Sequence, residues 1–226
     1  MVVADRTPKT WRGSALLCLC LGAPALAPAE PSRPDPAVLT LALRATNCAD
    51  SRGLVPHPTL VTVIDYTLPS TEPRLWVIER LTKRVIFQEQ VAHGRGSGEN
   101  YAERFSNRPG SYQTSLGLFL TGETYVGRNG YSLRLDGLER DINHLARERA
   151  IVMHGATYAS PAFALQHGRL GRSWGCPAVR PGVVRELFDA ISGGTPLFAY
   201  YADEKWLASS AFLNDCADDP DSRVGR

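Results

Sequence analysis

The sequence predicts a mainly β domain that carries one helix ahead of its strands and one helix near its C-terminal end. Three observations favour this fold class. Short runs rich in β-branched and aromatic residues dominate from residue 60 onward, Asn129-Gly130 is a strong hairpin signal, and no shift in composition divides residues 60–201. With 226 residues, the chain is long enough for one such domain with extensions at its ends. We therefore expect a single core with helices packed on it.

The leading helix is expected to start at Pro36. Asp35 is a favourable N-cap residue, and proline is tolerated in the first helical turn. Apolar residues then recur at helical spacing until Gly53, which stops the run. This apolar face consists of Val38, Leu41, Ala42, Ala45 and Cys48.

Strands are expected wherever a β-prone run is bounded by turn residues. These runs are residues 60–64, 74–78 and 84–87, the pair 125–126 and 131–135 on either side of Asn129-Gly130, and residues 197–200. A turn at 81–84 joins the second run to the third. A later amphipathic helix is indicated by Val183, Val184, Leu187, Phe188 and Ile191, and Gly193-Gly194 ends it.

The N-terminus has the features of an export signal. Arg6, Lys9 and Arg12 precede an apolar segment, residues 14–27, which is too short to span a bilayer comfortably, and Ala27-Pro28-Ala29 offers a small-residue cleavage site. An uncleaved anchor is the alternative. A lipid-modified Cys18 or Cys20 is disfavoured, because no small residue precedes either.

These features divide the chain into four parts. Residues 1–29 form the signal peptide, 30–36 a proline-rich linker, 37–216 the folded domain and 217–226 a polar tail. We expect an exported protein, periplasmic or in the cell envelope, with no stable membrane insertion after cleavage. The whole chain has a net charge of +2, and loss of the signal peptide removes two net positive charges. The near-neutral remainder gives no case for a nucleic-acid partner.

Three of the five cysteines remain after cleavage: Cys48, Cys176 and Cys216. In an oxidising compartment two can pair and one is left over. If Cys176 acts as a nucleophile, Cys48 and Cys216 form the disulfide by elimination. The alternative is that Cys48 is simply a buried position on the apolar face of the leading helix.

The chemistry of the chain is expected at Cys176. It lies in the small-residue segment 171–179, and His154 ends a β-branched run upstream. An imidazole within hydrogen-bond reach can hold a thiol as thiolate. Gly175 lets the backbone approach a substrate closely, and the amides around it could form an oxyanion hole. The two segments together predict acyl transfer through a thioester.

Other interpretations of these residues are weaker. Cys176 could be a buried structural cysteine, but its neighbours form a turn rather than an apolar run. A metal site from His154, His167 and Cys176 would lack nearby carboxylates in its outer shell. The glycine-rich segment 93–98 lacks the lysine and the strand–helix context of a phosphate loop. We therefore expect neither a metal nor a cofactor.

The combination of His154-Gly155 with Ser173-Trp174-Gly175-Cys176 resembles the active-site signature of the L,D-transpeptidases of peptidoglycan, which have the YkuD-like fold. Trp174 stands where that signature usually has histidine, and Ala178 where it usually has asparagine. Both departures are similar to the divergent murein L,D-transpeptidase branch with a Ser-Trp-Gly-Cys core. The resemblance extends over about residues 38–216.

The resemblance implies a β-sandwich or barrel with a cysteine in a cleft. It implies that the Cys176 thiolate attacks the bond before the terminal D-Ala of a peptidoglycan stem tetrapeptide, with His154 as the base and the Gly155 carbonyl orienting its ring. Backbone amides of Trp174, Gly175 and Cys176 would hold the oxyanion. It also implies that carbapenems acylate Cys176. No cofactor is required.

Substrate contacts are expected from Arg172, Ser173, Arg95 and His93, with the two arginines pairing with stem-peptide carboxylates unless they are simply solvated surface residues. Three functions remain open at this point. The thioester could pass to an acceptor amine, in transpeptidation or D-amino-acid exchange. It could pass to water, as in an L,D-carboxypeptidase, or the domain could be a non-catalytic wall-binding module.

Overall fold

The computed structural model describes residues 1–2 and 32–216 of the chain. The expected signal peptide beyond its second residue, the first part of the linker and the polar tail from 217 onward lie outside the described residues. Residues 32–216 belong to one compact unit. Among the described residues, no helix is both long and apolar enough to cross a membrane.

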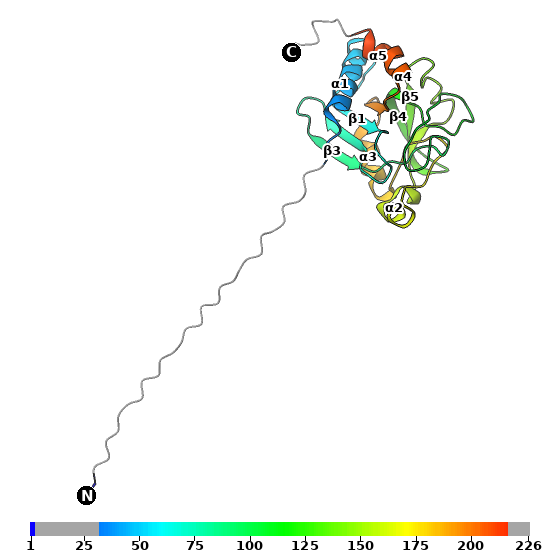
Figure 1. Cartoon of the computed structure of the whole chain (residues 1–226). Coiled ribbons are helices and arrows are strands. Elements are labelled where there is room, and N and C mark those ends of the chain that lie inside the picture. Colours follow the sequence, from blue (N-terminus) through cyan, green and yellow to red (C-terminus); the bar gives the residue numbers. More distant parts are fainter. Residues whose placement is uncertain (3–31, 217–226) are drawn as a thin grey trace. The chain divides into compact units, whose positions relative to one another are not determined.

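The fold is built on one eight-stranded, barrel-like sheet, as the sequence predicted in its mainly β class (Figure 1). Along the sheet the strands follow the order β3-β2-β1-β8-β4-β5-β6-β7. Their bounds are β1 Leu60–Asp65, β2 Leu75–Glu79, β3 Val85–Glu89, β4 Gly117–Gly127, β5 Gly130–Gly137, β6 Val152–Gly155, β7 Ala178–Val179 and β8 Pro196–Tyr200.

Strand β8 joins the antiparallel strands β3-β2-β1 to the strands β4-β5-β6-β7, of which the last two pair in parallel. On one side it runs parallel to β1, with Val63 opposite Phe198, and on the other it runs antiparallel to β4. The β4–β5 pair closes at Gly130, which has a φ of +74° and confirms the expected hairpin. Four of the five β8 residues and five of the six β1 residues are buried, so the last strand in the sequence lies at the centre of the core.

Helix α1 (Pro36–Ser51) begins where the sequence predicted. The Asp35 carboxylate accepts hydrogen bonds from the amides of Ala37 at 2.7 Å and Val38 at 3.4 Å, which satisfies two amides of the first turn. Its buried face packs on β1 and β8. This face includes Val38, Ala42, Ala45, Cys48 and Ala49.

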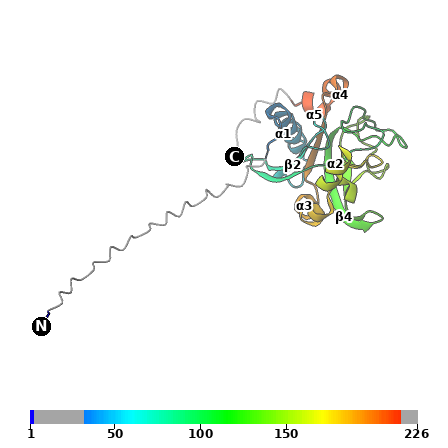
Figure 2. The same cartoon turned by 60° about the horizontal axis from the view of Figure 1, so that its bottom comes forward.

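Helix α3 (Val184–Ile191) is the second predicted helix and buries its apolar face against the sheet. Three shorter helices were not predicted from the sequence: α2 (Pro161–His167), α4 (Glu204–Ser209) and α5 (Ala211–Asn214). Two 3₁₀ turns, η1 (Thr157–Ala159) and η2 (Pro181–Val183), complete the described elements. Figure 2 shows α1 beside α5. The three short helices bury too few apolar residues for their periodicity to be recognised in the sequence.

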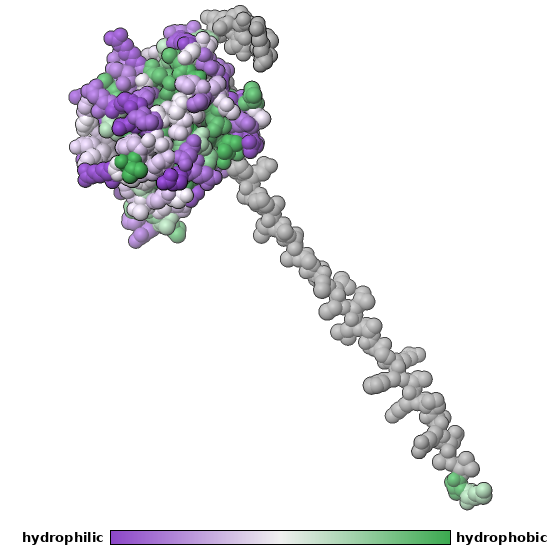
Figure 3. All heavy atoms as spheres, turned by 180° about the vertical axis from the view of Figure 1, so that it is seen from behind, coloured by the Kyte–Doolittle hydropathy of each residue, from purple (hydrophilic) through white to green (hydrophobic). Residues whose placement is uncertain are grey.

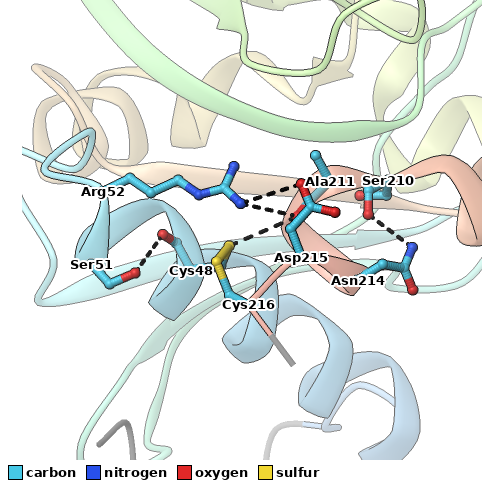
Figure 4. The surroundings of a disulfide bond; sticks show 8 residues. All are labelled: Cys48, Ser51, Arg52, Ser210, Ala211, Asn214, Asp215 and Cys216. Atoms are coloured by element: carbon cyan, nitrogen blue, oxygen red, sulfur yellow. Dashed lines mark hydrogen bonds and ion pairs between the residues drawn. A yellow bond between two sulfur atoms is a disulfide. The ribbon is translucent and has the colours of Figure 1, made fainter. Parts of the chain in front are cut away.

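A disulfide joins Cys48 of α1 to Cys216, just beyond α5 (Figure 4). The two Cα atoms lie 5.5 Å apart, and 168 positions separate the two residues in sequence. Nearby, the Arg52 guanidinium contacts the Asp215 carboxylate at 3.5 Å. The bridge therefore ties the first helix to the last one across the domain.

The segment between β3 and β4 forms no strand, yet it carries residues that contact the turn of residues 173–176, here called the cysteine turn. Isolated bridges pair Ala92 with Ala178 and Gly94 with Ser173, so this long connection lies directly against residues 173–178.

Large exposed hydrophobic side chains are distributed over several elements, and the face in Figure 3 shows hydrophobic patches separated by hydrophilic residues. Trp174 is one of these exposed side chains, at 64 %.

Candidate active site

Cys176 lies at the end of the turn that precedes β7, and it is the one free cysteine among the described residues. The Val152 amide donates a hydrogen bond to its Sγ at 3.4 Å. The thiol in turn contacts the Ala150 carbonyl oxygen at 3.7 Å. The backbone just before and at the start of β6 therefore surrounds the sulfur on one side, and the side chain is half-buried.

His154 lies on β6 opposite Ala178 of β7, two positions beyond Cys176. Its ring is 6 % exposed, and Nδ1 lies 3.0 Å from the carbonyl oxygen of Gly155. Because a carbonyl only accepts, Nδ1 carries the proton and Nε2 is the basic nitrogen. No hydrogen bond engages Nε2 within the part of the chain that the structure describes, and none there joins the imidazole to the thiol.

The two side chains are both in their neutral forms at neutral pH. Burial raises the pKa of the Cys176 thiol, and the Val152 amide and the charge of Arg149 offset this only in part. Burial also lowers the pKa of His154, against the hydrogen bond to the Gly155 carbonyl. These directions disfavour the preformed thiolate that the sequence suggested, because a low-polarity environment penalises both charged partners.

The turn before Cys176 is held by the hydroxyl of Ser173. Ser173 Oγ donates to the Cys176 carbonyl at 2.6 Å and accepts from the Gly175 amide at 3.0 Å. The amides of Trp174 and Cys176 have no hydrogen-bond acceptor among the described residues, whereas the Gly175 amide is already engaged. Of the three expected oxyanion donors, only two are therefore free.

Gly175 is required by the geometry of this turn. Its φ is +126°, and a Cβ atom there would lie 2.9 Å from the Gln113 carbonyl oxygen and 2.9 Å from the Ile151 side chain. Gly94 is equally constrained, since a Cβ would lie 2.7 Å from the Gly175 Cα atom. Both glycines allow the 93–114 segment to pack against the cysteine turn at backbone contact distance.

Two of the expected substrate contacts need correction. His93 is 1 % exposed; its Nδ1 accepts from Arg74 at 2.8 Å and its Nε2 faces the Gly98 carbonyl at 3.4 Å. Burial and the charge of Arg74 lower the pKa of His93 to about 3, so it is a neutral internal residue. Ser173 is also buried and uses its hydroxyl within the turn. Neither side chain is open to a substrate, because both satisfy the backbone of the loops that shape the site.

The two arginines expected to bind substrate differ in whether they already contact a carboxylate. Arg172 contacts the Glu99 carboxylate at 2.5 Å and the Gly98 carbonyl at 3.1 Å. Arg95 has no carboxylate partner among the described residues, and its guanidinium lies 4.2 Å from the ring centre of Tyr112 and 5.8 Å from that of Trp174. Arg95 therefore remains available to an anion, held over two aromatic faces.

Both arginines line a cavity of about 340 Å³ between the 95–104 segment and Arg172, the residue just before the cysteine turn. The other lining residues are Gly98, Glu99, Asn100, Tyr101, Glu103 and Arg104. The Arg95 amide donates to the Ser173 carbonyl at 2.8 Å, so this cavity is attached to the turn that presents Cys176. Within the described chain, no group of three or more His, Cys, Asp or Glu residues could hold a metal ion.

Two residues that contact this region were given no site role from the sequence. Thr114 Oγ1 accepts from the Gly94 amide at 2.9 Å and donates to the Gly175 carbonyl at 3.1 Å. Arg149, just before β6, hydrogen-bonds to the Gln113 carbonyl at 2.7 Å. No local pattern indicates these contacts, since each residue acts on a segment far from it in sequence.

Comparison with known proteins gives a consistent family. A family model described as "L,D-transpeptidase catalytic domain" matches residues 31–200. A search of curated proteins finds no match. Similar solved structures include an L,D-transpeptidase from Mycobacterium smegmatis, with 14 % identity, a TM-score of 0.40 and coverage of 63 % of this chain and 59 % of that chain.

Two further structures are similar at the same level. One is the L,D-transpeptidase LdtMt1 in complex with imipenem, with 15 % identity, a TM-score of 0.39 and coverage of 63 % and 59 %. The other is the L,D-transpeptidase (Yku) from Stackebrandtia nassauensis, with 16 % identity, a TM-score of 0.39 and coverage of 72 % and 66 %. This chain therefore matches less than two thirds of each of these three solved chains.

The family match spans the region from just before α1 to the end of β8, and so includes His154, Cys176 and the whole sheet. It covers well over half of the sequence. The chain belongs to the L,D-transpeptidase catalytic domain family.

Proposed function

We propose that the protein is a peptidoglycan-modifying cysteine acyltransferase. It attacks the stem-tetrapeptide bond before the terminal D-Ala and transfers the acyl group from a Cys176 thioester to an amine, in transpeptidation or D-amino-acid exchange. The observation that supports this most is the arrangement of the 173–176 turn. Among the described residues, a free thiol lies there beside two amides without an acceptor, and the neighbouring strand β6 carries an imidazole whose basic nitrogen has no partner.

In this proposal the reaction starts from a neutral pair. His154 Nε2 takes the thiol proton as Cys176 Sγ bonds to the scissile carbonyl carbon, and then gives it to the departing amine of D-Ala. The Gly155 carbonyl stabilises the imidazolium through Nδ1–H. An acceptor amine then attacks the thioester, its proton passes to the imidazole, and the thiol is regenerated.

The oxyanion would be held by the free amides of Trp174 and Cys176. The Gly175 amide contributes only if it leaves Ser173 Oγ. Arg95 would bind a stem-peptide carboxylate in the adjoining cavity, because its guanidinium is oriented by Tyr112 and unpaired among the described residues. Arg172 would help to shape the cavity through Glu99.

The expected location is outside the cytoplasm, in the periplasm or cell envelope. Peptidoglycan stem peptides are found there, and the disulfide between Cys48 and Cys216 is typical of an oxidising compartment. Stem peptides are the proposed partner, and the proposal includes no cofactor.

Mass spectrometry of purified muropeptides after incubation tests the proposal. Cross-linked or D-amino-acid-exchanged products are expected with the wild-type protein and should be missing with Cys176→Ala, whose fold is checked by circular dichroism. Trimmed tripeptides alone would replace the proposal with an L,D-carboxypeptidase. No change in the muropeptides would leave a non-catalytic wall-binding module.

Intact-mass analysis with a carbapenem provides a second test. We expect one adduct, located by peptide mapping at Cys176, because the thiol is the nucleophile of the proposed reaction. An adduct at another residue, or one that persists in Cys176→Ala, would contradict this role.

A further inference from the structure

Arg149 is a half-buried cation with only neutral partners. Its guanidinium donates to the Ser106 carbonyl at 2.6 Å, the Ser115 hydroxyl at 2.5 Å, the Ser111 hydroxyl at 3.3 Å and the Gln113 carbonyl at 2.7 Å. No carboxylate lies within ion-pair distance among the described residues. A half-buried charge without an opposite charge is less well solvated than one in water, so its presence requires a reason.

The position of Arg149 relative to the cysteine turn suggests that reason. The Gln113 carbonyl that accepts its hydrogen bond lies 2.9 Å from where a Cβ atom of Gly175 would be. The next residue in the chain, Ala150, provides the carbonyl that contacts the Cys176 thiol at 3.7 Å. Arg149 is thus connected to the turn both through Gln113 and through its own neighbour.

The other titratable groups that face Cys176 come from three elements. Tyr66 after β1 and Tyr158 of η1 have pKa values that the Cys176 charge raises, and His154 of β6 lies opposite Ala178 of β7. Burial and the Cys176 charge raise the pKa of both phenols, that of Tyr158 to about 12, so both are neutral. Burial keeps His154 neutral as well. Arg149 is therefore the group among these four that carries a positive charge while Cys176 is still a thiol.

We propose that Arg149 is a positioning residue that stabilises the Cys176 thiolate through its positive charge once the thiol proton has left. This inference rests on the proposed role of Cys176 as nucleophile. The environment of the sulfur agrees with this role. Burial raises the pKa of the Cys176 thiol, and the positive charge of Arg149 acts in the opposite direction. In this arrangement Arg149 lowers the cost of charging a sulfur that burial disfavours, and His154 is left to move the proton.

The rate of Cys176 alkylation by iodoacetamide, measured between pH 6 and pH 10, tests the charge directly. Arg149→Gln and Arg149→Met both remove the charge, and the second is available should the first fail to fold. In either variant we expect alkylation at pH 8 to be about tenfold slower, which corresponds to a thiol pKa about one unit higher. Arg149→Lys, which keeps the charge but not the planar set of donors, should stay close to wild type.

Arg147 provides the matched control, since it lies on the same segment and pairs with Glu123 and Asp136 at the surface. Arg147→Gln should leave the alkylation profile unchanged. The inference is overturned if the neutral Arg149 variants follow the wild-type profile, or if Arg149→Lys is as slow as they are, which would indicate a purely structural clamp. Alkylation requires no peptidoglycan, so a protein that behaves as expected here but forms no cross-links would contradict the proposed function alone.

Discussion

The Thr114 hydroxyl donates a hydrogen bond to the Gly175 carbonyl at 3.1 Å, across 61 positions of sequence. The same oxygen accepts a hydrogen bond from the Gly94 amide at 2.9 Å. Thr114 is 2 % exposed, so water does not replace these partners. One side chain therefore fixes the glycine-rich 93–98 segment and the cysteine turn relative to each other.

Thr114→Val should destabilise the protein and disorder the turn. The substitution keeps the shape of the side chain but leaves the Gly94 amide and the Gly175 carbonyl buried without partners, which costs about 1–3 kcal/mol each. Urea denaturation measures the loss. Thr114→Ser, which keeps the hydroxyl, is the control, and equal midpoints for the Val and wild-type proteins would show that this contact has no energetic weight.

His154→Ala should slow the acylation of Cys176 by about 10²–10⁴-fold while leaving donor binding nearly unchanged, because it removes the base and not a substrate contact. Stopped-flow acylation with a carbapenem separates the rate from the affinity. His144→Ala is a suitable control, since His144 contacts Asn107 and the Asp141 amide in another loop. A wild-type acylation rate in His154→Ala would exclude His154 as the base.

Cys176 alkylation in the free protein should keep increasing through pH 9. Burial raises the thiol pKa, so the thiolate fraction at pH 7 is smaller than for an exposed cysteine and grows as pH rises. The lowered pKa of His154 keeps the imidazole neutral over this range. The pH profile of iodoacetamide alkylation measures this. A plateau that begins below pH 7 would instead indicate a preformed thiolate–imidazolium pair.

Arg95→Ala should raise the KM for a stem-tetrapeptide donor about tenfold or more, with a smaller effect on kcat, because charge-assisted hydrogen bonds to a carboxylate are worth about 1.5–3 kcal/mol. Steady-state kinetics with the free-acid donor and with a donor amidated at its carboxylates measure this directly. The amidated donor should bind wild type and variant equally. A loss that is the same for both donors would mean that Arg95 acts on the loop and not on the carboxylate.

The disulfide should be present in the exported protein and should stabilise it. Protein that begins at Glu30 and is unfolded without reductant should show one free thiol. Replacing both Cys48 and Cys216 with alanine should lower the free energy of unfolding by up to about 5 kcal/mol, since the bridge closes a loop of 168 positions. Three free thiols, or unchanged stability in the double variant, would contradict this expectation.

Much of the fold was predictable because its signals are local. The Asp35 cap with Pro36, the β-prone runs of the strands and the Asn129-Gly130 turn each depend on residues within a few positions of one another. The cysteine count left Cys48 and Cys216 as the pair that the structure joins. Cys176 and His154 could be proposed as site residues for the same reason, since each proposal depends on the residue's own short segment.

Only the tertiary structure decided how these segments meet. The insertion of β8 between β1 and β4, the contact of Thr114 with Gly175, and the approach of Arg149 to the cysteine turn join residues that no sequence period connects. Burial decided the rest. Burial makes His93 and Ser173 internal hydrogen-bonding residues, and it favours the neutral forms of Cys176 and His154. The reason is that desolvation is set by the packing around a side chain and not by the residues beside it in sequence.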